Sequence, residues 1–243
     1  MGCTIGWIKT KSGFIMFKNR DRDPEENVLS NFILKDNGLT TFEDKKFRGC
    51  WFGINKYFGI TNTLGPYGGV PVGYTCENEN LELNKIVLQR AKSVEEATKL
   101  YQQLFFEQKI GQSYNVFICD SKQANIIELV LNKSNVKTFE NSVFRTNTFF
   151  SMTEYNINPK IVEGSVQRLE KLLELVRNVE SAEDVIPILR FHSKNGLENI
   201  CRHDYGVTVG STVLESRGDK AIIYYLLNKS PCKGEYEKEI LKF

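Results

Sequence analysis

Histidine is scarce in this sequence, and the cysteines do not form metal-binding pairs. Of 243 residues only two are histidines, and the six cysteines include no Cys-x-x-Cys spacing. Cys201 and His203 are the only close Cys/His pair, which is weak support for zinc, because structural zinc usually has four ligands in short, spaced pairs. A papain-like dyad would need His192 or His203 beside a cysteine, and nothing in the spacing favours this. We expect free thiols and neither a metal nor an organic cofactor.

An excess of charge of one sign is also missing. The 32 basic and 30 acidic residues leave a net charge of +2, and no run of lysine and arginine is long enough to form a basic groove. Proteins that bind nucleic acids usually carry such a patch, because they must neutralise phosphates. We therefore expect no nucleic-acid partner.

Long apolar runs are absent as well. No stretch approaches the roughly 18 apolar residues of a membrane-spanning helix. The start of the chain lacks the basic and apolar regions of a secretory signal. These absences predict a cytoplasmic protein with no membrane partner.

What is present suits one globular domain over residues 1–243. Hydrophobic residues make up 41% of the chain, which is enough for a sizeable core. Strand-like runs occur in pairs joined by turns, and helix-like segments lie in two blocks between them. This order favours an α+β fold of antiparallel sheets with flanking helices over alternating βαβ units. Strands are expected at residues 3–10, 14–18, 47–54, 57–62, 115–119, 125–131, 143–147, 207–214 and 220–227, and helices at about 81–88, 93–107, 165–179 and 181–191.

The candidate catalytic group is Cys3, which leads directly into the first predicted hairpin. A cysteine thiol needs a nearby base to act as a nucleophile. If the two residues before it are removed, its own α-amino group can be that base, because α-amino groups have a usual pKa of about 7.7–8.0. An antiparallel hairpin then brings Lys18 and Asp21 beside it. Taken alone, a cysteine near the start is ordinary, and the charged run at 18–23 is typical of a solvated turn.

Short motifs along most of the chain add weight to Cys3. They are Lys18-Asn19-Arg20-Asp21, Gly53-Ile54-Asn55 with Gly59-Ile60-Thr61-Asn62, Arg145-Thr146-Asn147-Thr148-Phe149, Ser165-Val166-Gln167-Arg168, and Ile200-Cys201-Arg202-His203 with Thr208-Val209-Gly210-Ser211. In this order the chain resembles the N-terminal-nucleophile (Ntn) hydrolases of the penicillin V acylase, bile-salt hydrolase and isopenicillin-N acyltransferase group, especially the acyltransferase-like branch. The sequence departs from the group at Thr148, where histidine is usual.

The resemblance implies a four-layer αββα sandwich of antiparallel sheets. It also implies that Cys3 is the nucleophile, exposed by autoproteolytic cleavage of its bond to Gly2 after loss of Met1. Asp21 corresponds to an aspartate beside the nucleophile and is expected to orient the ammonium of the new first residue.

The resemblance further implies how the oxyanion is held. The Nδ2 of Asn147 and a backbone N–H near Asn62 are expected to donate to it. Lys18 or Arg202 is expected to favour the thiolate form of the nucleophile. The Gly/Pro-rich loop at 64–71, which includes Tyr67, is expected to border the acyl pocket.

A second family competes for the same residues. The N-R-D-E group of Ntn-like proteins shares an early cysteine and the Asn19-Arg20-Asp21 motif, but it has glutamate where this chain has Arg22. It implies the same fold with a different function, namely a non-catalytic protein that binds a lipid or a cofactor.

The function predicted first is hydrolysis or transfer of an acyl group at a linear, non-peptide C–N amide bond. The reaction would pass through a Cys3 acyl-enzyme, with a small-molecule amide as the partner. Acyl and amine specificity, the choice between hydrolysis and transfer, and a homo-oligomeric state are left open by the sequence.

Overall fold

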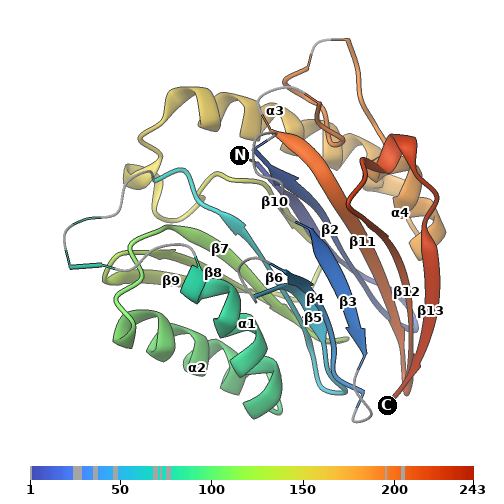
Figure 1. Cartoon of the computed structure of the whole chain (residues 1–243), viewed down its shortest axis with the longest axis horizontal. Coiled ribbons are helices and arrows are strands. Elements are labelled where there is room, and N and C mark those ends of the chain that lie inside the picture. The colour runs from blue at the N-terminus through green and yellow to red at the C-terminus, as the bar shows by residue number, and fades with distance from the viewer. Residues whose placement is uncertain are drawn as a thin grey trace.

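Two antiparallel β-sheets lie face to face in the computed structural model, and helices cover both outer faces (Figure 1). The structure describes residues 2–23, 29–34, 38–45, 49–67, 71, 73–74, 78–194, 196–203 and 206–243. The first sheet has the strand order β10 (Val143–Arg145), β1 (Thr4–Lys9), β2 (Gly13–Arg22), β11 (Val207–Arg217), β12 (Lys220–Leu227) and β13 (Glu237–Lys242). The second sheet has the order β3 (Ser30–Leu34), β4 (Thr40–Asp44), β5 (Cys50–Ile54), β6 (Gly59–Leu64), β7 (Tyr114–Cys119), β8 (Ala124–Val130) and β9 (Lys133–Phe139).

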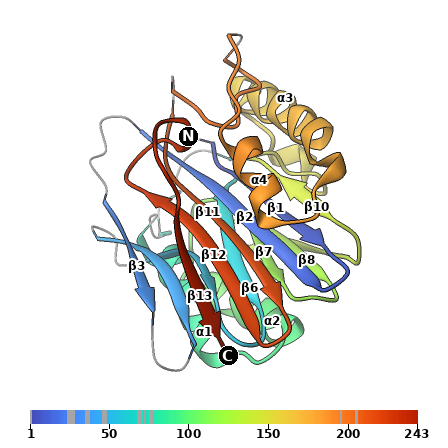
Figure 2. The ribbon, with the colours of Figure 1, turned by 90° about the vertical axis from the view of Figure 1, so that its right-hand side faces the viewer.

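The helices form the two outer layers. α1 (Asn78–Arg90) and α2 (Val94–Glu107) cover the second sheet, whereas α3 (Pro159–Leu175) and α4 (Ala182–Leu189) cover the first (Figures 1 and 2). Short 3-10 turns follow at Thr153–Tyr155, Val176–Asn178 and Pro231–Lys233. The predicted α+β fold with four αββα layers is confirmed. Among the described residues, none of the helices combines the length and apolar character needed to cross a membrane.

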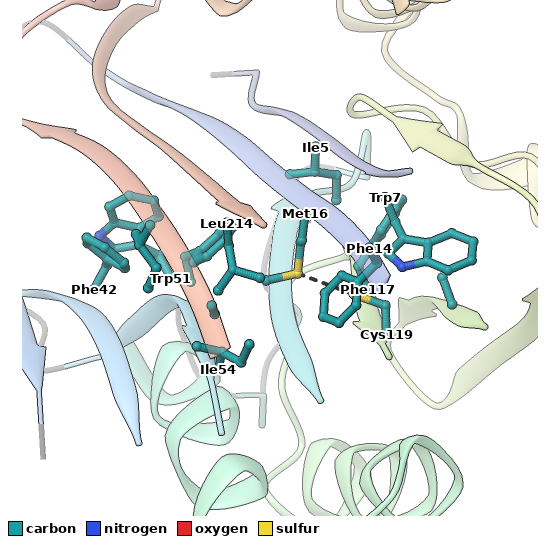
Figure 3. Close-up of a cluster of buried hydrophobic side chains, with 14 of the residues drawn as sticks. Ile5, Trp7, Phe14, Met16, Phe42, Trp51, Ile54, Phe117, Cys119 and Leu214 are labelled. Carbon is teal, nitrogen blue, oxygen red and sulfur yellow. Dashed lines mark hydrogen bonds between the residues drawn. The ribbon is translucent and has the colours of Figure 1, made fainter. Parts of the chain in front are cut away.

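Strand alternation sends the side chains of β2 into two different cores. Phe14 and Met16 lie in the core between the sheets, whereas Ile15 and Phe17 lie in the core beneath α3 and α4. Figure 3 shows the inter-sheet core, in which the sulfur atoms of Met16 and Cys119 lie 3.4 Å apart. Burying each large apolar side chain contributes about 1.5–3 kcal/mol. These two cores therefore hold β2 firmly at the centre of the first sheet.

Several strands differ from the sequence prediction. β3, β9 and β13 are edge strands, and β4 lies next to one of them. None of the four was predicted, because charged and polar residues on edge strands obscure the alternating apolar pattern. The strand predicted from residue 47 begins at Cys50, and residues 46–48 lie outside the described part of the chain.

Helix α3 begins earlier than predicted. The amphipathic pattern starts near residue 165, but the helix starts at Pro159, because the side chain of Asn158 accepts a hydrogen bond from Ile161 N. Asparagine before a first-turn proline is a favourable helix start. The N-cap at Ser93, predicted from its spacing to Glu96, is confirmed, since the Ser93 hydroxyl accepts from Glu96 N at 3.1 Å.

Candidate active site

Cys3 lies at the mouth of the inter-sheet space, immediately before β1. Ile5 and Trp7 of this strand belong to the inter-sheet core, and strand alternation directs Cys3 toward the same face. β1 pairs with β10 through Ile5 and Arg145, and this register, extended by two residues, brings Cys3 opposite Asn147. Cys3 is half-buried and lines a pocket together with Asn147, which we call the nucleophile pocket.

The charged end of β2 forms the floor of the nucleophile pocket. Lys18, Arg20 and Arg22 continue the face of Phe14 and Met16 and extend into the inter-sheet space. All three cations are buried within the strand. The reading of this run as a solvated turn is therefore wrong. β2 continues through Arg22 because it pairs with β11 along its whole length.

Lys18 joins the two sheets beneath Cys3. Its Nζ donates to Asn62 O at 2.5 Å, and to Trp51 O and Asn62 Oδ1 at 3.3 Å each. Burial lowers the pKa of Lys18 from 10.5 to about 8, and the neighbouring Cys3 opposes this shift. Lys18 is therefore still mostly a cation at neutral pH, and it lies close enough to Cys3 for the two groups to interact electrostatically.

Arg20 and Arg22 share one buried carboxylate. Arg22 Nη2 lies 2.9 Å from Asp44 Oδ2, and Arg20 donates both to this oxygen and to Ser30 Oγ. Ser30 Oγ in turn donates to Asp44 Oδ1 at 3.1 Å. Two arginines therefore meet the carboxylate of Asp44 beside Lys18, which makes this end of β2 a buried charged cluster.

Asp21 points the other way, toward the late segment that carries Arg202. Its Oδ1 accepts from Thr208 Oγ1 at 2.7 Å, and its Oδ2 lies 3.6 Å from Arg202 Nη1. Within the described residues Oδ2 receives no hydrogen bond. Burial raises the pKa of Asp21 from 3.8 to about 6, and Arg202 and Arg168 lower it in part. The carboxylate thus keeps one acceptor for a further donor.

The raised pKa of Asp21 predicts a measurable pH dependence of stability. Below pH 3.8 the carboxyl is protonated in both states, and as the pH rises to about 6 the unfolded chain ionises first, so the folded state loses relative stability. We therefore compare Asp21→Asn with its parent, both in the Cys3→Ala chain. The free energy of unfolding of the variant should rise relative to that of the parent by roughly 2–3 kcal/mol between these pH values. Urea unfolding at pH 4, 5, 6 and 7 checks this. A constant difference would contradict it, because lost contacts to the arginines produce only a constant offset.

Asn147 is fixed by four neighbours. Its backbone N–H donates to Ser165 Oγ at 2.7 Å, and its Oδ1 accepts from Arg168 Nη2 at 2.9 Å. Its Nδ2 donates to Thr63 Oγ1 at 2.9 Å and to Leu64 O at 2.7 Å. Both amide hydrogens are used. The predicted role of Asn147 as an oxyanion donor therefore requires one of these bonds to be released.

Asn62 offers a second side-chain donor. Its Nδ2 is buried, has no hydrogen-bond partner within the described residues, and belongs to a residue that lines the nucleophile pocket. Its Oδ1 accepts from Lys18, which fixes the orientation of the amide. The sequence predicted only a backbone donor near Asn62. The structure makes the side chain an additional candidate.

Ser165 and Arg168 were not predicted as site residues, although both belong to a motif found in the sequence. They lie three residues apart on α3, which places them on one face of the helix, and both contact Asn147. Burial, together with the nearby positive charge of Arg202, lowers the pKa of Arg168 from 12.5 to about 10. The spacing indicated a shared helix face, but only the fold shows which residue this face supports.

Gly2 lies between the nucleophile pocket and a second pocket of about 420 Å³, which we call the outer pocket. A Cβ on Gly2 would lie 2.7 Å from Arg168 Nη2, 2.8 Å from Asn147 Oδ1 and 2.9 Å from Arg202 Nη1. Only glycine fits at this position without moving those side chains. Met1 lies outside the described residues.

Among the described residues of the loop predicted to border the acyl pocket, the one at its start lines the nucleophile pocket. Leu64 lines the nucleophile pocket, whereas Tyr67 lines neither pocket and packs edge-on against Tyr155. Residues 68–70 of this loop lie outside the described part of the chain. No histidine lines the nucleophile pocket within the described residues, so a Cys3/His dyad is not formed.

Comparisons with known proteins agree with this fold. The family model for acyl-coenzyme A:6-aminopenicillanic acid acyl-transferase matches residues 8–216. The structure is similar to a mutant of conjugated bile acid hydrolase from Clostridium perfringens, with a TM-score of 0.53 and 12% identity over 98% of this chain and 96% of the other. It is also similar to penicillin V acylase from Agrobacterium tumefaciens, with a TM-score of 0.50 and 11% identity over 92% and 82%.

At such low identities the two structures support the fold, and the family model supports the family. No curated protein sequence matches the chain significantly. The matched segment includes all the site residues described above except Gly2 and Cys3. The chain therefore belongs to the acyl-coenzyme A:6-aminopenicillanic acid acyl-transferase family, within the Ntn group of amidohydrolases and acyltransferases.

Proposed function

We propose that this chain is an amidohydrolase or acyltransferase that uses Cys3 as its nucleophile on a linear, non-peptide C–N amide bond. The observation that carries the proposal is that Cys3, Lys18, Asp21, Asn62 and Asn147 converge on one pocket from both sheets. The family match begins at residue 8, so it does not include Cys3. The role of this cysteine therefore rests on the geometry around it.

The proposed chemistry uses the α-amino group of Cys3 as the base. The thiol gives its proton to this amine, and the sulfur attacks the amide carbonyl. Asn62 Nδ2, or Asn147 Nδ2 once released, donates to the oxyanion, and one such donor lowers the barrier by about 3–4 kcal/mol. The ammonium then protonates the leaving amine, and a thioester remains. Water or a second amine attacks the thioester and restores the thiol.

This mechanism requires the Cys3 amine to be exposed first. In the described chain that amine is bound in a peptide with Gly2. The Cys3 sulfur is proposed to attack the Gly2 carbonyl, shift the acyl group from nitrogen to sulfur, and release it to water. The new ammonium would then meet Asp21 Oδ2, the buried acceptor that has no donor among the described residues. The open acceptor supports this processing step.

The outer pocket is the proposed site of the substrate. Gly2 lines both pockets, so its removal would join them into one cavity. The outer pocket combines basic with aliphatic side chains and one carboxylate. Its lining includes Lys160, Arg168 and Arg202 as cations, Ile161 and Leu197 as apolar groups, and Glu163. This lining suits an amide with an apolar part and a carboxylate.

Trapping the acyl-enzyme tests the proposed function. Wild-type protein mixed with p-nitrophenyl esters and acyl-coenzyme A thioesters, then quenched in acid, should gain the mass of one acyl group. Peptide mapping should place that group on an N-terminal peptide that begins at Cys3. Full turnover of amides by a chain that keeps Gly2 would contradict the mechanism, as would acylation at another cysteine.

Gly2→Ala should slow the processing of the precursor. The added methyl group would press on three polar side-chain ends at 2.7–2.9 Å, so the scissile peptide must move away from the site. We expect the unprocessed fraction after expression to rise from near zero to most of the protein. Intact mass spectrometry measures this fraction, and the thermal unfolding midpoint of the variant controls for folding. Complete processing in Gly2→Ala would show that Gly2 does not need this close fit.

A further inference from the structure

Both histidines of the chain lie beside cysteines at a second site, outside the nucleophile pocket. His203 Nε2 lies 3.1 Å from Cys232 Sγ and 3.7 Å from Cys201 Sγ. The ligand atoms of His192, His203 and Cys232 all lie within 4.8 Å of one another. The spacing along the sequence had favoured no histidine beside a cysteine in a papain-like dyad, and the structure brings the two residue types together here. The sequence concealed the cluster because Cys232 is distant along the chain.

We propose that Cys201, His203, Cys232 and His192 form a tetrahedral zinc site. Zinc bonds of about 2.0–2.3 Å to nitrogen and sulfur place neighbouring ligand atoms about 3.3–3.8 Å apart. The two distances from His203 Nε2 already lie near this range. The Cys₂His₂ set is a common one for structural zinc. The argument for this zinc site does not depend on the proposed amidase function.

The three segments that supply the ligands are already held together by other contacts. Cys201 N donates to Phe191 O at 2.9 Å, which joins the segment after α4 to the Cys201 segment. Arg190 Nη2 donates to Gly234 O at 2.9 Å, which joins the same region to the 3-10 turn that carries Cys232. Figure 1 shows this red turn beside α4. The backbone segments that carry the proposed ligands are therefore already joined to one another without a metal.

His192 is oriented as a ligand in the way metal-binding histidines usually are. Its Nδ1 lies 3.1 Å from Arg190 O, so an Nδ1–H would donate to this carbonyl. The other ring nitrogen, Nε2, would then be free of its proton and able to bind zinc. His192 is exposed, and so its ring can turn toward the cluster. His203 uses Nε2 as well, as its contacts to both thiols show.

Zinc is the metal that this donor set favours. Thiolate and imidazole ligands in a tetrahedral arrangement suit Zn²⁺, whereas Mg²⁺ and Ca²⁺ require oxygen ligands. Binding replaces the S–H protons of Cys201 and Cys232 by bonds to the metal, and these two protons pass to the buffer. No oxidation or reduction takes part.

The position of the site suggests what the metal does. Arg202 lies between the ligands Cys201 and His203, and its guanidinium reaches Asp21 at 3.6 Å. A zinc ion would fix the short segment that carries this arginine and tie it to the C-terminal turn. The role is therefore structural, with an indirect effect on the nucleophile pocket.

Metal binding to the full chain tests the proposal. Cys3→Ala serves as the background, because it removes the other half-buried thiol of the described chain. After treatment with a chelator and a reductant, this protein should bind one Zn²⁺ per chain in a competition titration. With Co²⁺ it should show thiolate-to-metal charge transfer and the strong visible bands of a tetrahedral site. A weak, octahedral Co²⁺ spectrum would overturn the proposal.

Ligand variants locate the metal. His203→Ala and Cys232→Ala should each weaken Zn²⁺ binding at least about 100-fold, because they remove ligands and not merely outer-shell partners. His192→Gln changes an exposed side chain and should weaken binding without unfolding the protein. Cys119→Ala is the control, because Cys119 lies in the inter-sheet core, and it should bind zinc like its parent. If His192→Gln, His203→Ala and Cys232→Ala all bound zinc as tightly as their Cys3→Ala parent, the proposal would be overturned.

Discussion

Cys3→Ala is expected to leave a chain that begins at Gly2 and has lost nearly all amidase activity. The thiol is proposed both to cut its own peptide bond and to form the acyl-enzyme, so its loss removes both reactions. When a nucleophile is removed from other hydrolases, only the weak effect of binding and oxyanion groups remains, and we expect a loss of at least about 10³-fold in kcat/KM. Intact mass spectrometry and amide turnover measure the two effects on the same sample.

The matched control for this experiment is Cys119→Ala. Cys119 is a buried thiol in the inter-sheet core that lines neither the nucleophile pocket nor the outer pocket. This variant should be processed like wild type, although it should be less stable because it leaves a cavity. Loss of Gly2 from Cys3→Ala would mean that another protease exposes Cys3. If wild type also kept Gly2, the non-catalytic binding protein would become the better description.

Asn62→Ala and Asn147→Ala are expected to lose about 10²–10³-fold in kcat each, the usual effect of one oxyanion donor. Their effects on stability should differ. Asn147 holds α3 and β6 together through bonds to Arg168, Ser165 and Leu64, although its backbone bond survives the substitution. We expect Asn147→Ala to cost about 1–3 kcal/mol in the free energy of unfolding.

Asn62→Ala should cost less stability, because its Nδ2 has no partner within the described residues and its Oδ1 accepts only at 3.3 Å from Lys18. Steady-state kinetics on an amide substrate and urea unfolding of the same preparations give the two readouts. Asn62→Asp is a useful companion, since it keeps the shape but replaces the donor by an acceptor. Unchanged kcat in both Asn62 variants would assign the donor to the backbone, as the sequence suggested.

Measurements on the asparagine variants also distinguish a catalytic role from a structural one. If kcat falls in Asn147→Ala in proportion to the loss of folded protein alone, Asn147 acts through structure. If kcat per folded molecule falls and KM does not change, the lost interaction belongs to the transition state. One of the two hydrogen bonds from Asn147 Nδ2, to Thr63 or to Leu64, must then open in the processed enzyme.

The sequence by itself determined the fold class and most of the candidate residues of the site. Hairpins separated by two blocks of helices predicted the layered α+β fold, because an amphipathic helix or strand must bury its apolar face against another layer. The motifs around Lys18, Asp21 and Asn147 marked residues that lie around Cys3 in the structure. These signals are local or depend on motif order, and so one chain is enough to show them.

Only the tertiary structure decided which of these residues contact one another. Alternation on a strand places Lys18 and Asp21 on opposite faces, but the sequence does not say that one face meets Asn62 and the other Arg202. Ser165 contacts Asn147 because α3 packs against the end of β10. Such contacts depend on which strands pair and in which register, and pairing between distant segments leaves no local pattern.

The Cys/His cluster shows the same limit most clearly. Cys201 and His203 are close in sequence but gave only weak support for a metal site, because the other two proposed ligands lie elsewhere in the chain. Cys232 lies in the turn before β13, an edge strand that was not predicted because of its polar residues. His192 lies in the loop after α4. The fold brings both residues to His203. Composition and motif spacing determined which chemistry this chain carries, whereas long-range packing decided which side chains meet, because a site built from distant segments exists only once the layers have closed on each other.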